Sequence, residues 1–180
     1  MKVNFLLLVL ITLFPACQTE KEKEYFPFQT FLQQELNQID SLPVAIFKYS
    51  KRNDKTDTVI IEKKKFREIT SALLNIDLLN KDNLDAYTEL VLEDTDIDNI
   101  NISYTTDNKK APIKQLQLNI NPGTSLVKNF YVERMDQIND LNILRKILWT
   151  SQKGVTIISL YYQDNKLKEQ LTEKYSWSIQ

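Results

Sequence analysis

The chain has 180 residues, a formal net charge of −1 at pH 7, no histidine and a single cysteine. Its balanced charge gives no basic excess for nucleic acid, and its only glycines, Gly123 and Gly154, cannot form a glycine-rich phosphate loop. Without histidine, the commonest general base and metal ligand is missing, and no Ser/His or Cys/His catalytic arrangement can form.

The first residues have the pattern of a secretory signal peptide. Lys2 supplies the positive start, residues 3–14 supply an apolar core, and Ala16 is a small residue before the cleavage point. At about 1.5 Å per residue, the apolar run is roughly 18 Å long, whereas a hydrocarbon core is about 30 Å thick. We therefore expect a cleaved signal peptide over residues 1–16 and no membrane-spanning helix.

Residues 14–17, Phe-Pro-Ala-Cys, resemble the lipobox of bacterial lipoproteins. The resemblance implies cleavage between Ala16 and Cys17, a thioether from Cys17 to diacylglycerol, and acylation of the new amino group by a chain such as palmitate. Because each buried methylene contributes about 0.8 kcal/mol, two or three chains anchor firmly where one does not. Gln18, in place of Asp, suggests the outer membrane, with the periplasmic or surface side left open. The alternative is a chance cysteine beside an ordinary cleavage site.

The residues that follow the cysteine are charged and have no apolar period, so they predict a solvated tether. The predicted division is a signal peptide over residues 1–16, an acylated cysteine with a flexible tether over residues 17–24, and a single globular α+β domain over residues 25–180. With Cys17 bound to lipid, the mature chain has no disulfide. The domain must therefore be stable through packing alone.

Helices and a hairpin are predicted in the first half of this domain. Residues 28–39 carry apolar side chains at helical spacing. Two β-rich runs, residues 43–50 and 56–63, flank a polar turn and predict a hairpin. A second helical stripe predicts a helix over residues 65–76. Residues 84–92 fit a helix or a strand, and the sequence slightly favours a short helix.

Six β-rich runs separated by turn-forming residues fill the second half. They recur about every 12 residues, which is typical of an antiparallel meander. Leu116, Leu118 and Ile120 alternate with polar residues, so one face of the sheet should be dry and the other wet. We interpret the last run, residues 167–179, as one strand. The alternative is a helical turn followed by a shorter strand that starts near Tyr175. The runs are residues 100–106, 113–121, 126–135, 143–150, 155–163 and 167–179.

Together these elements predict an α+β fold with an antiparallel meander sheet of about six C-terminal strands plus an N-terminal hairpin. The sheet is expected to be curved or half-barrel-like and covered by two or three helices. This layout resembles the half-barrel of LolA/LolB-type lipoprotein carriers. Residues 87–104, residues 144–149 and Tyr175-Ser176-Trp177 are similar to uncharacterised Bacteroidota lipoproteins of the outer membrane, a resemblance that implies a fold but no activity.

Asp94, Asp96 and Asp98 have the 1-3-5 spacing of a calcium loop. However, the sixth position is Asn99 instead of Gly, and the twelfth is Thr105 instead of Glu. We therefore interpret this segment as a solvated turn that enters a strand, and the sequence predicts no metal site.

Two further clusters have a functional and a structural interpretation. The basic residues 63–65, with Arg67, suggest contact with lipid headgroups or phosphates, but cations at the end of a strand are usually a solvated edge. Four aromatic residues suggest either a ligand cleft or, as we favour, a core. They are Trp149, Tyr161, Tyr162 and Trp177.

The sequence predicts a lipid-anchored envelope protein, not an enzyme, with no catalytic residue, no cofactor and no nucleic-acid partner. Its domain is expected to bind an apolar ligand in a curved sheet or another envelope protein. One alternative is a structural or assembly accessory with a solid core, and another is a hydrolase that uses carboxylates alone. Interior volume separates the first two, because a cavity of several hundred Å³ suits an internal ligand whereas a packed interior suits docking.

Overall fold

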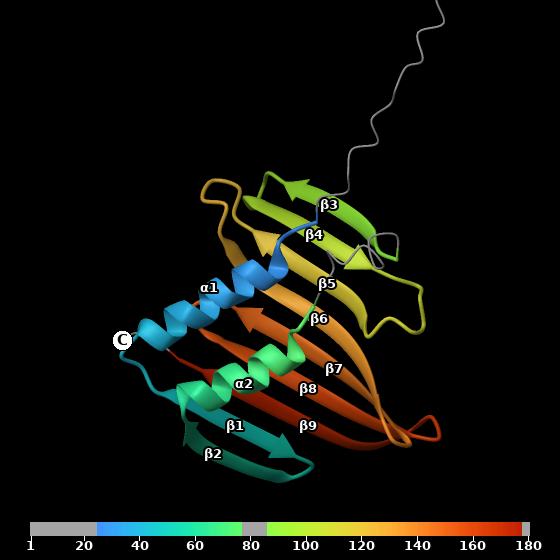
Figure 1. The fold of residues 1–180 in the computed structure, drawn as a ribbon. Helices are drawn as coiled ribbons and strands as arrows, with labels where there is room; N and C mark the ends of the chain where they lie inside the picture. Colours follow the sequence, from blue (N-terminus) through green and yellow to red (C-terminus); the bar gives the residue numbers. More distant parts are fainter. Residues whose placement is uncertain (1–24, 77–85, 178–180) are drawn as a thin grey trace, which may run out of the picture.

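The computed structural model describes residues 25–76 and 86–177, which form an open antiparallel sheet with two helices on one of its faces (Figure 1). Residues 1–24, which hold the predicted signal peptide and tether, lie outside the described residues. The elements follow in this order: α1 (Phe28–Ser41), β1 (Ile46–Arg52), β2 (Lys55–Ile61), α2 (Lys63–Leu73), β3 (Thr88–Asp94), β4 (Asn99–Thr105), β5 (Ile113–Ile120), β6 (Val127–Ile138), β7 (Leu141–Thr150), β8 (Gly154–Gln163) and β9 (Lys166–Ser176).

The strand order is β2-β1-β9-β8-β7-β6-β5-β4-β3. Seven consecutive strands form the meander, and the N-terminal hairpin β1–β2 joins it by pairing β1 with β9, where Phe47 lies opposite Ser176. The turns suit hairpins, as in β8–β9, where Asp164 and Asn165 have φ angles of 51° and 59°. Asp and Asn adopt this left-handed conformation more readily than most residues, which favours a tight two-residue turn.

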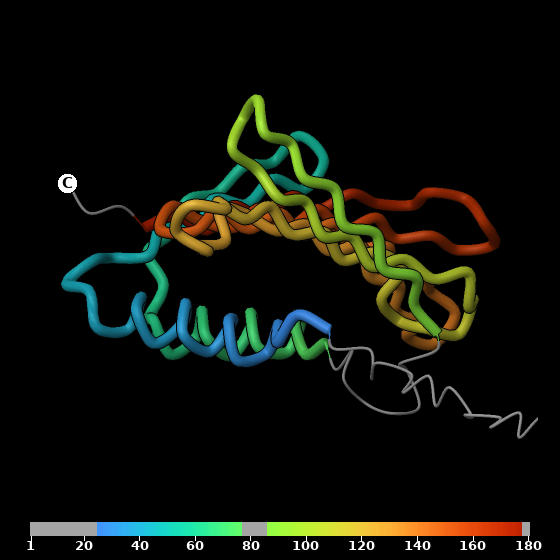
Figure 2. Tube along the Cα trace, turned by 90° about the horizontal axis from the view of Figure 1, so that it is seen from above, coloured from blue at the N-terminus to red at the C-terminus, as the bar shows by residue number. Residues whose placement is uncertain are grey.

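Both helices cover the same face of the sheet, which we call the inner face (Figure 2). Helix α1 buries the predicted stripe and ends at Ser41, just before the Leu42-Pro43 dipeptide. Helix α2 lies beside α1 and buries Phe66. The buried residues of α1 are Phe28, Leu32, Leu36 and Ile39.

Aromatic rings fill the space between the helices and the sheet. The Trp149 side chain is fully buried, stacks on Phe130 with ring centroids 5.6 Å apart, and lies 5.3 Å from Trp177. Its indole Nε1 donates a hydrogen bond of 3.0 Å to Glu35 Oε2 on α1. Trp149 and Trp177 are therefore core residues, which is the interpretation that the sequence favoured over a ligand cleft. Tyr161 and Tyr162 are both half-buried and follow each other on one strand, so they point to opposite faces of the sheet.

The structure confirms the α+β class, the two helices, the hairpin and the six predicted strand runs, including a final strand over Lys166–Ser176. The sheet is larger than expected, because residues 88–94 form β3 and include residues 88–92 of the segment 84–92, where a short helix was favoured; residues 84 and 85 lie outside the described residues. The spacing of apolar residues in this segment fits both a helix and a strand, and pairing with β4 makes it a strand. The choice of a helix was wrong because β4 offers β3 a complete ladder of backbone hydrogen bonds.

Candidate ligand-binding face of the sheet

The outer face of the sheet, opposite the helices, is not covered by any described element (Figure 2). The pairing register identifies its residues, because partners across neighbouring strands point to the same side. One row crosses the whole sheet from β2 to β3. This row consists of Thr58, Tyr49, Lys174, Thr156, Leu148, Tyr131, Gln117, Ser103 and Leu90.

In the part of the outer face formed by β4, β5 and β6, polar side chains bind one another. Asn119 accepts a hydrogen bond of 2.9 Å from Asn101 and donates one of 2.7 Å to Asn129. Nearby, the Tyr131 hydroxyl donates to Glu133 Oε2 over 3.0 Å. Burial, with a smaller contribution from Glu133, raises the pKa of Tyr131 to about 12. These groups already have partners, so they offer little to a ligand.

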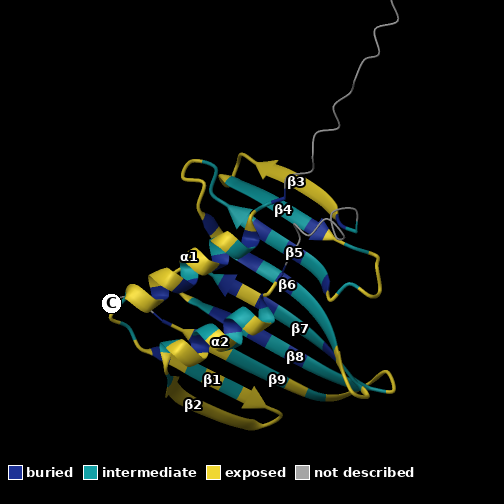
Figure 3. Ribbon diagram, in the orientation of Figure 1, coloured by how far each residue is buried: buried dark blue, intermediate teal, exposed yellow. Residues whose placement is uncertain are grey.

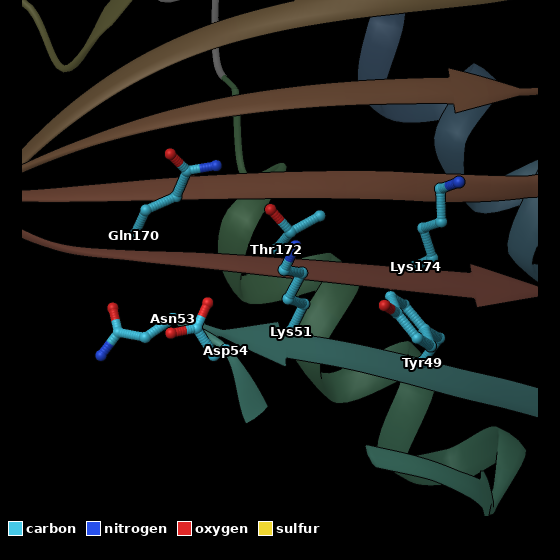
Figure 4. Close-up of a pocket in the computed structure, with 7 residues that line it drawn as sticks. All are labelled: Tyr49, Lys51, Asn53, Asp54, Gln170, Thr172 and Lys174. Atoms are coloured by element: carbon cyan, nitrogen blue, oxygen red, sulfur yellow. The ribbon is translucent and has the colours of Figure 1, made fainter. Parts of the chain in front are cut away.

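A groove of about 620 Å³ lies on the outer face between β1 and β9 (Figure 4). Tyr49 lies opposite Lys174 in the β1–β9 ladder, and Lys51 lies opposite Thr172, so these four side chains project from one patch. The lining is mostly polar and holds two cations and one carboxylate. It consists of Tyr49, Lys51, Asn53, Asp54, Gln170, Thr172 and Lys174.

A second depression, of about 270 Å³, extends across β9, β8 and β7 and shares Lys174 with the first groove. Leu148, Thr156 and Lys153 are among its other lining residues. Gly154 also lines it, and an added Cβ at this residue would lie only 2.4 Å from the backbone oxygen of Tyr175. Glycine is thus the residue that allows β8 and β9 to approach closely at this point.

Charges on β1 and β9 are separated between the two faces. On the inner face, Glu173 pairs with Lys48 at 2.6 Å, and Glu169 Oε1 lies 2.9 Å from Arg52 Nε without the alignment of a hydrogen bond. These pairs give both acidic residues of β9 a cationic partner on the inner face. Lys51 and Lys174 are on the opposite face, and neither belongs to any ion pair of the described residues. The groove is therefore cationic.

The basic cluster of residues 63–67 has a structural role at the junction of the helices. Arg67 donates to Asp40 Oδ2 at 2.8 Å and to Asn37 Oδ1 at 2.9 Å, both on α1. Lys63 donates to the backbone oxygens of Asp40 and Leu42 at the end of α1. These contacts join α2 to α1. Of the basic cluster, only Lys64 and Lys65 are therefore left for contacts at the surface.

The structure places the other predicted site residues as follows. Asp94, Asp96 and Asp98 lie at the exposed β3–β4 hairpin turn, where Asp94 Oδ1 accepts a hydrogen bond from the Asp96 amide at 3.0 Å. Across residues 25–76 and 86–177, no three acidic or cysteine side chains are grouped so that they could hold a metal ion. Ala16 and Cys17 lie outside the described residues.

Sequence reasoning missed the groove. The alternation of Lys168, Gln170, Thr172 and Lys174 in β9 marks a polar face, but the pairing of β9 with Tyr49 and Lys51 of β1 is a tertiary event. No local pattern indicates it.

No protein-family model matches the chain, and neither a curated protein nor a solved structure is significantly similar to it. Within the described residues, no helix has the length and apolar character needed to cross a membrane. The geometry and charge of the outer face are therefore the features of the described residues that bear on function.

Proposed function

We propose that this protein is a lipid-anchored lipoprotein of the cell envelope, not an enzyme, that binds a ligand or partner on the outer face of its sheet. One observation carries the proposal. The outer face is left uncovered by the described residues and carries the two connected grooves, whereas the helices and an aromatic core fill the inner face. In Figure 3 the buried residues gather between the helices and the central strands.

The packed interior favours docking over internal carriage. A half-barrel carrier needs a cavity, and ligand sites have volumes of about 300–1,000 Å³. The open grooves of about 620, 350 and 270 Å³ on the described residues are lined by residues of strands and loops, not of α1 or α2. The rings of Phe66, Trp149 and Trp177 occupy that space instead. This arrangement supports an accessory that docks its partner outside.

The proposed anchor fits the place where the folded domain begins. Tyr25 is buried, and its hydroxyl donates a hydrogen bond of 3.2 Å to the backbone oxygen of Tyr87, beside the start of β3. Fully extended, the seven residues from Gln18 to Glu24 reach roughly 25 Å. A lipid on Cys17 would hold the domain within that distance of the outer membrane.

Replacing Cys17 by serine is expected to release the protein from the membrane without unfolding it. Serine keeps the size of the side chain but lacks the thiol that forms the thioether, so no diacylglycerol is attached. Fractionation of cells that carry Cys17→Ser should move the protein from the membrane to the soluble fraction. Thr19→Ser, which changes a neighbouring tether residue, should remain with the membrane. Retention of the Cys17→Ser protein in the membrane fraction would refute the lipid anchor.

Photo-crosslinking in the intact envelope tests the docking face. A photoreactive residue at Leu148, which is 47% exposed in the middle of the outer face, should give a discrete adduct. The same residue at Gln34, which is exposed on α1 on the opposite side of the protein, should give none. Equal labelling at the two positions, or no adduct at Leu148, would rule out docking on the outer face.

A further inference from the structure

We propose that the groove between β1 and β9, with its extension across β8 and β7, binds an anionic polysaccharide, a polymer of sugars that carry carboxylate, sulfate or phosphate groups. The inference rests on the proposed use of the outer face and names the chemistry of its ligand. Positive charge, hydroxyl and amide groups and an exposed ring are combined there.

The charge of the groove is complementary to an anionic ligand. Lys51 and Lys174 line the groove, and Lys153 lies in the depression that Lys174 connects to it. The nearby acids Glu169 and Glu173 point to the inner face, where Arg52 and Lys48 pair with them. Only Asp54 opposes the lysines among the lining residues. Three lysines thus face one carboxylate, and an anionic ligand would balance the remaining positive charge.

The side chains that line the groove can form the hydrogen bonds that a saccharide needs. Thr172 supplies a hydroxyl, Gln170 and Asn53 supply amides, and Asp54 supplies an acceptor. Hydroxyls and amides both donate and accept hydrogen bonds, as the hydroxyls of sugars require. Figure 4 shows Lys51 and Thr172 side by side, with Lys174 and Tyr49 close together at the far end of the groove. The ring of Tyr49, 36% exposed, gives the C–H face of a sugar an apolar surface.

The site is long enough for an extended chain. The two depressions share Lys174 and cross β1, β9, β8 and β7. At about 4.8 Å between strands, this path is roughly 14 Å long, more than a single headgroup needs. Thr156 and Thr150 continue the row of hydroxyls along it. An extended chain therefore fits better than a small anion.

Nucleic acid and acidic peptides fit less well. Nucleic acid requires a broad basic surface and usually several stacking rings, but the chain has a net charge of −1 and this groove has one aromatic ring. An acidic peptide would use the lysines but would leave most of the hydroxyls and amides without partners. A glycan with spaced anionic groups uses both kinds of side chain.

The test measures binding of the detergent-solubilised full chain to heparin and polygalacturonate, with neutral dextran and poly-L-glutamate as reference polymers. We expect at least one anionic glycan to bind, more weakly as salt increases, because screening weakens exposed charge pairs. Dextran should not bind, and poly-L-glutamate should bind at least tenfold more weakly than the glycan. Equal binding of poly-L-glutamate would overturn the assignment to a saccharide.

Variants localise the site. Lys51→Gln with Lys174→Gln should weaken glycan binding at least tenfold, and Thr172→Val, which removes a hydroxyl at nearly constant shape, should weaken it severalfold. Lys64→Gln with Lys65→Gln removes the same charge from α2 and should leave binding unchanged. If both lysine pairs have the same effect, or if neither glycan binds, the inference is wrong. If the glycan inference fails but the photoreactive residue at Leu148 gives an adduct in the envelope, docking on the outer face is still supported. If that adduct is also absent, both the glycan site and the proposed docking function are refuted.

Discussion

Replacing Leu118 with aspartate is expected to unfold the domain. Leu118 is fully buried in β5, and its neighbours in the ladder are Ile102 of β4 and Phe130 of β6. A carboxylate there has no cation or donor to compensate it, and burying such a group lies at the extreme of single substitutions. We expect the free energy of unfolding to fall by more than about 4 kcal/mol. Urea unfolding followed by circular dichroism measures this loss.

The adjacent residue provides the control. Gln117 precedes Leu118 and points to the outer face, where it lies opposite Ser103 and Tyr131. Gln117→Asp introduces the same side chain into the same strand, but on the face in contact with solvent. It should change the free energy of unfolding by less than about 1 kcal/mol. If the two variants unfolded at the same urea concentration, the assignment of inner and outer faces would be wrong.

The second large effect is expected at Asp136, which lies between two arginines on the inner face. Asp136 Oδ1 accepts a hydrogen bond of 2.7 Å from Arg134 Nε, and its other oxygen pairs with Arg145. Arg134 also donates to the backbone oxygen of Leu73 at the end of α2, over 3.1 Å. The carboxylate thus holds two cations beside the end of a helix, where the peptide dipoles favour positive charge.

Asp136→Asn should lower the free energy of unfolding by about 2–3 kcal/mol, because it leaves two neighbouring guanidinium groups without their anion. Loss of one partner from a fully buried pair costs about 3–5 kcal/mol, and these side chains retain some exposure, 16–20%, which reduces the penalty. Thermal or urea unfolding measures it. Asp140→Asn, the same change at an exposed residue of the β6–β7 turn, should be nearly neutral. An Asp136→Asn protein as stable as the parent would show that the cluster contributes nothing.

Periodic segments were predictable from the sequence because each carries its own signal. Helix α1 has a clear apolar stripe that stops before Pro43, and β5 alternates Leu116 and Leu118 with polar residues. The segment of β3 carries a mixed signal, because its apolar residues fit both a helical and a strand period. Leu90, Val91 and Leu92 are all exposed, so burial does not choose between the two, and pairing with β4 determines the structure.

The candidate site was not predictable for a different reason. Tyr49 and Lys174 are far apart in the chain and become neighbours only when β1 pairs with β9. A sequence pattern reports which residues of one strand share a face, but not which strand lies beside it. The cationic groove is therefore a property of the sheet order, whereas the aromatic core could be anticipated from residue type.

The pairing of β1 with β9 also determines when the domain can form. An early hairpin and the last strand of the meander must meet before the sheet is continuous, and the groove lies on that junction. Contacts between such distant segments require closure of a long loop, which slows folding. A nascent chain that lacks β9 leaves β1 paired with β2 alone, and the hairpin cannot join the meander. Late closure of this kind would suit the proposed attachment to the envelope, because a chain that folds late is still unfolded when it is threaded through a translocation channel.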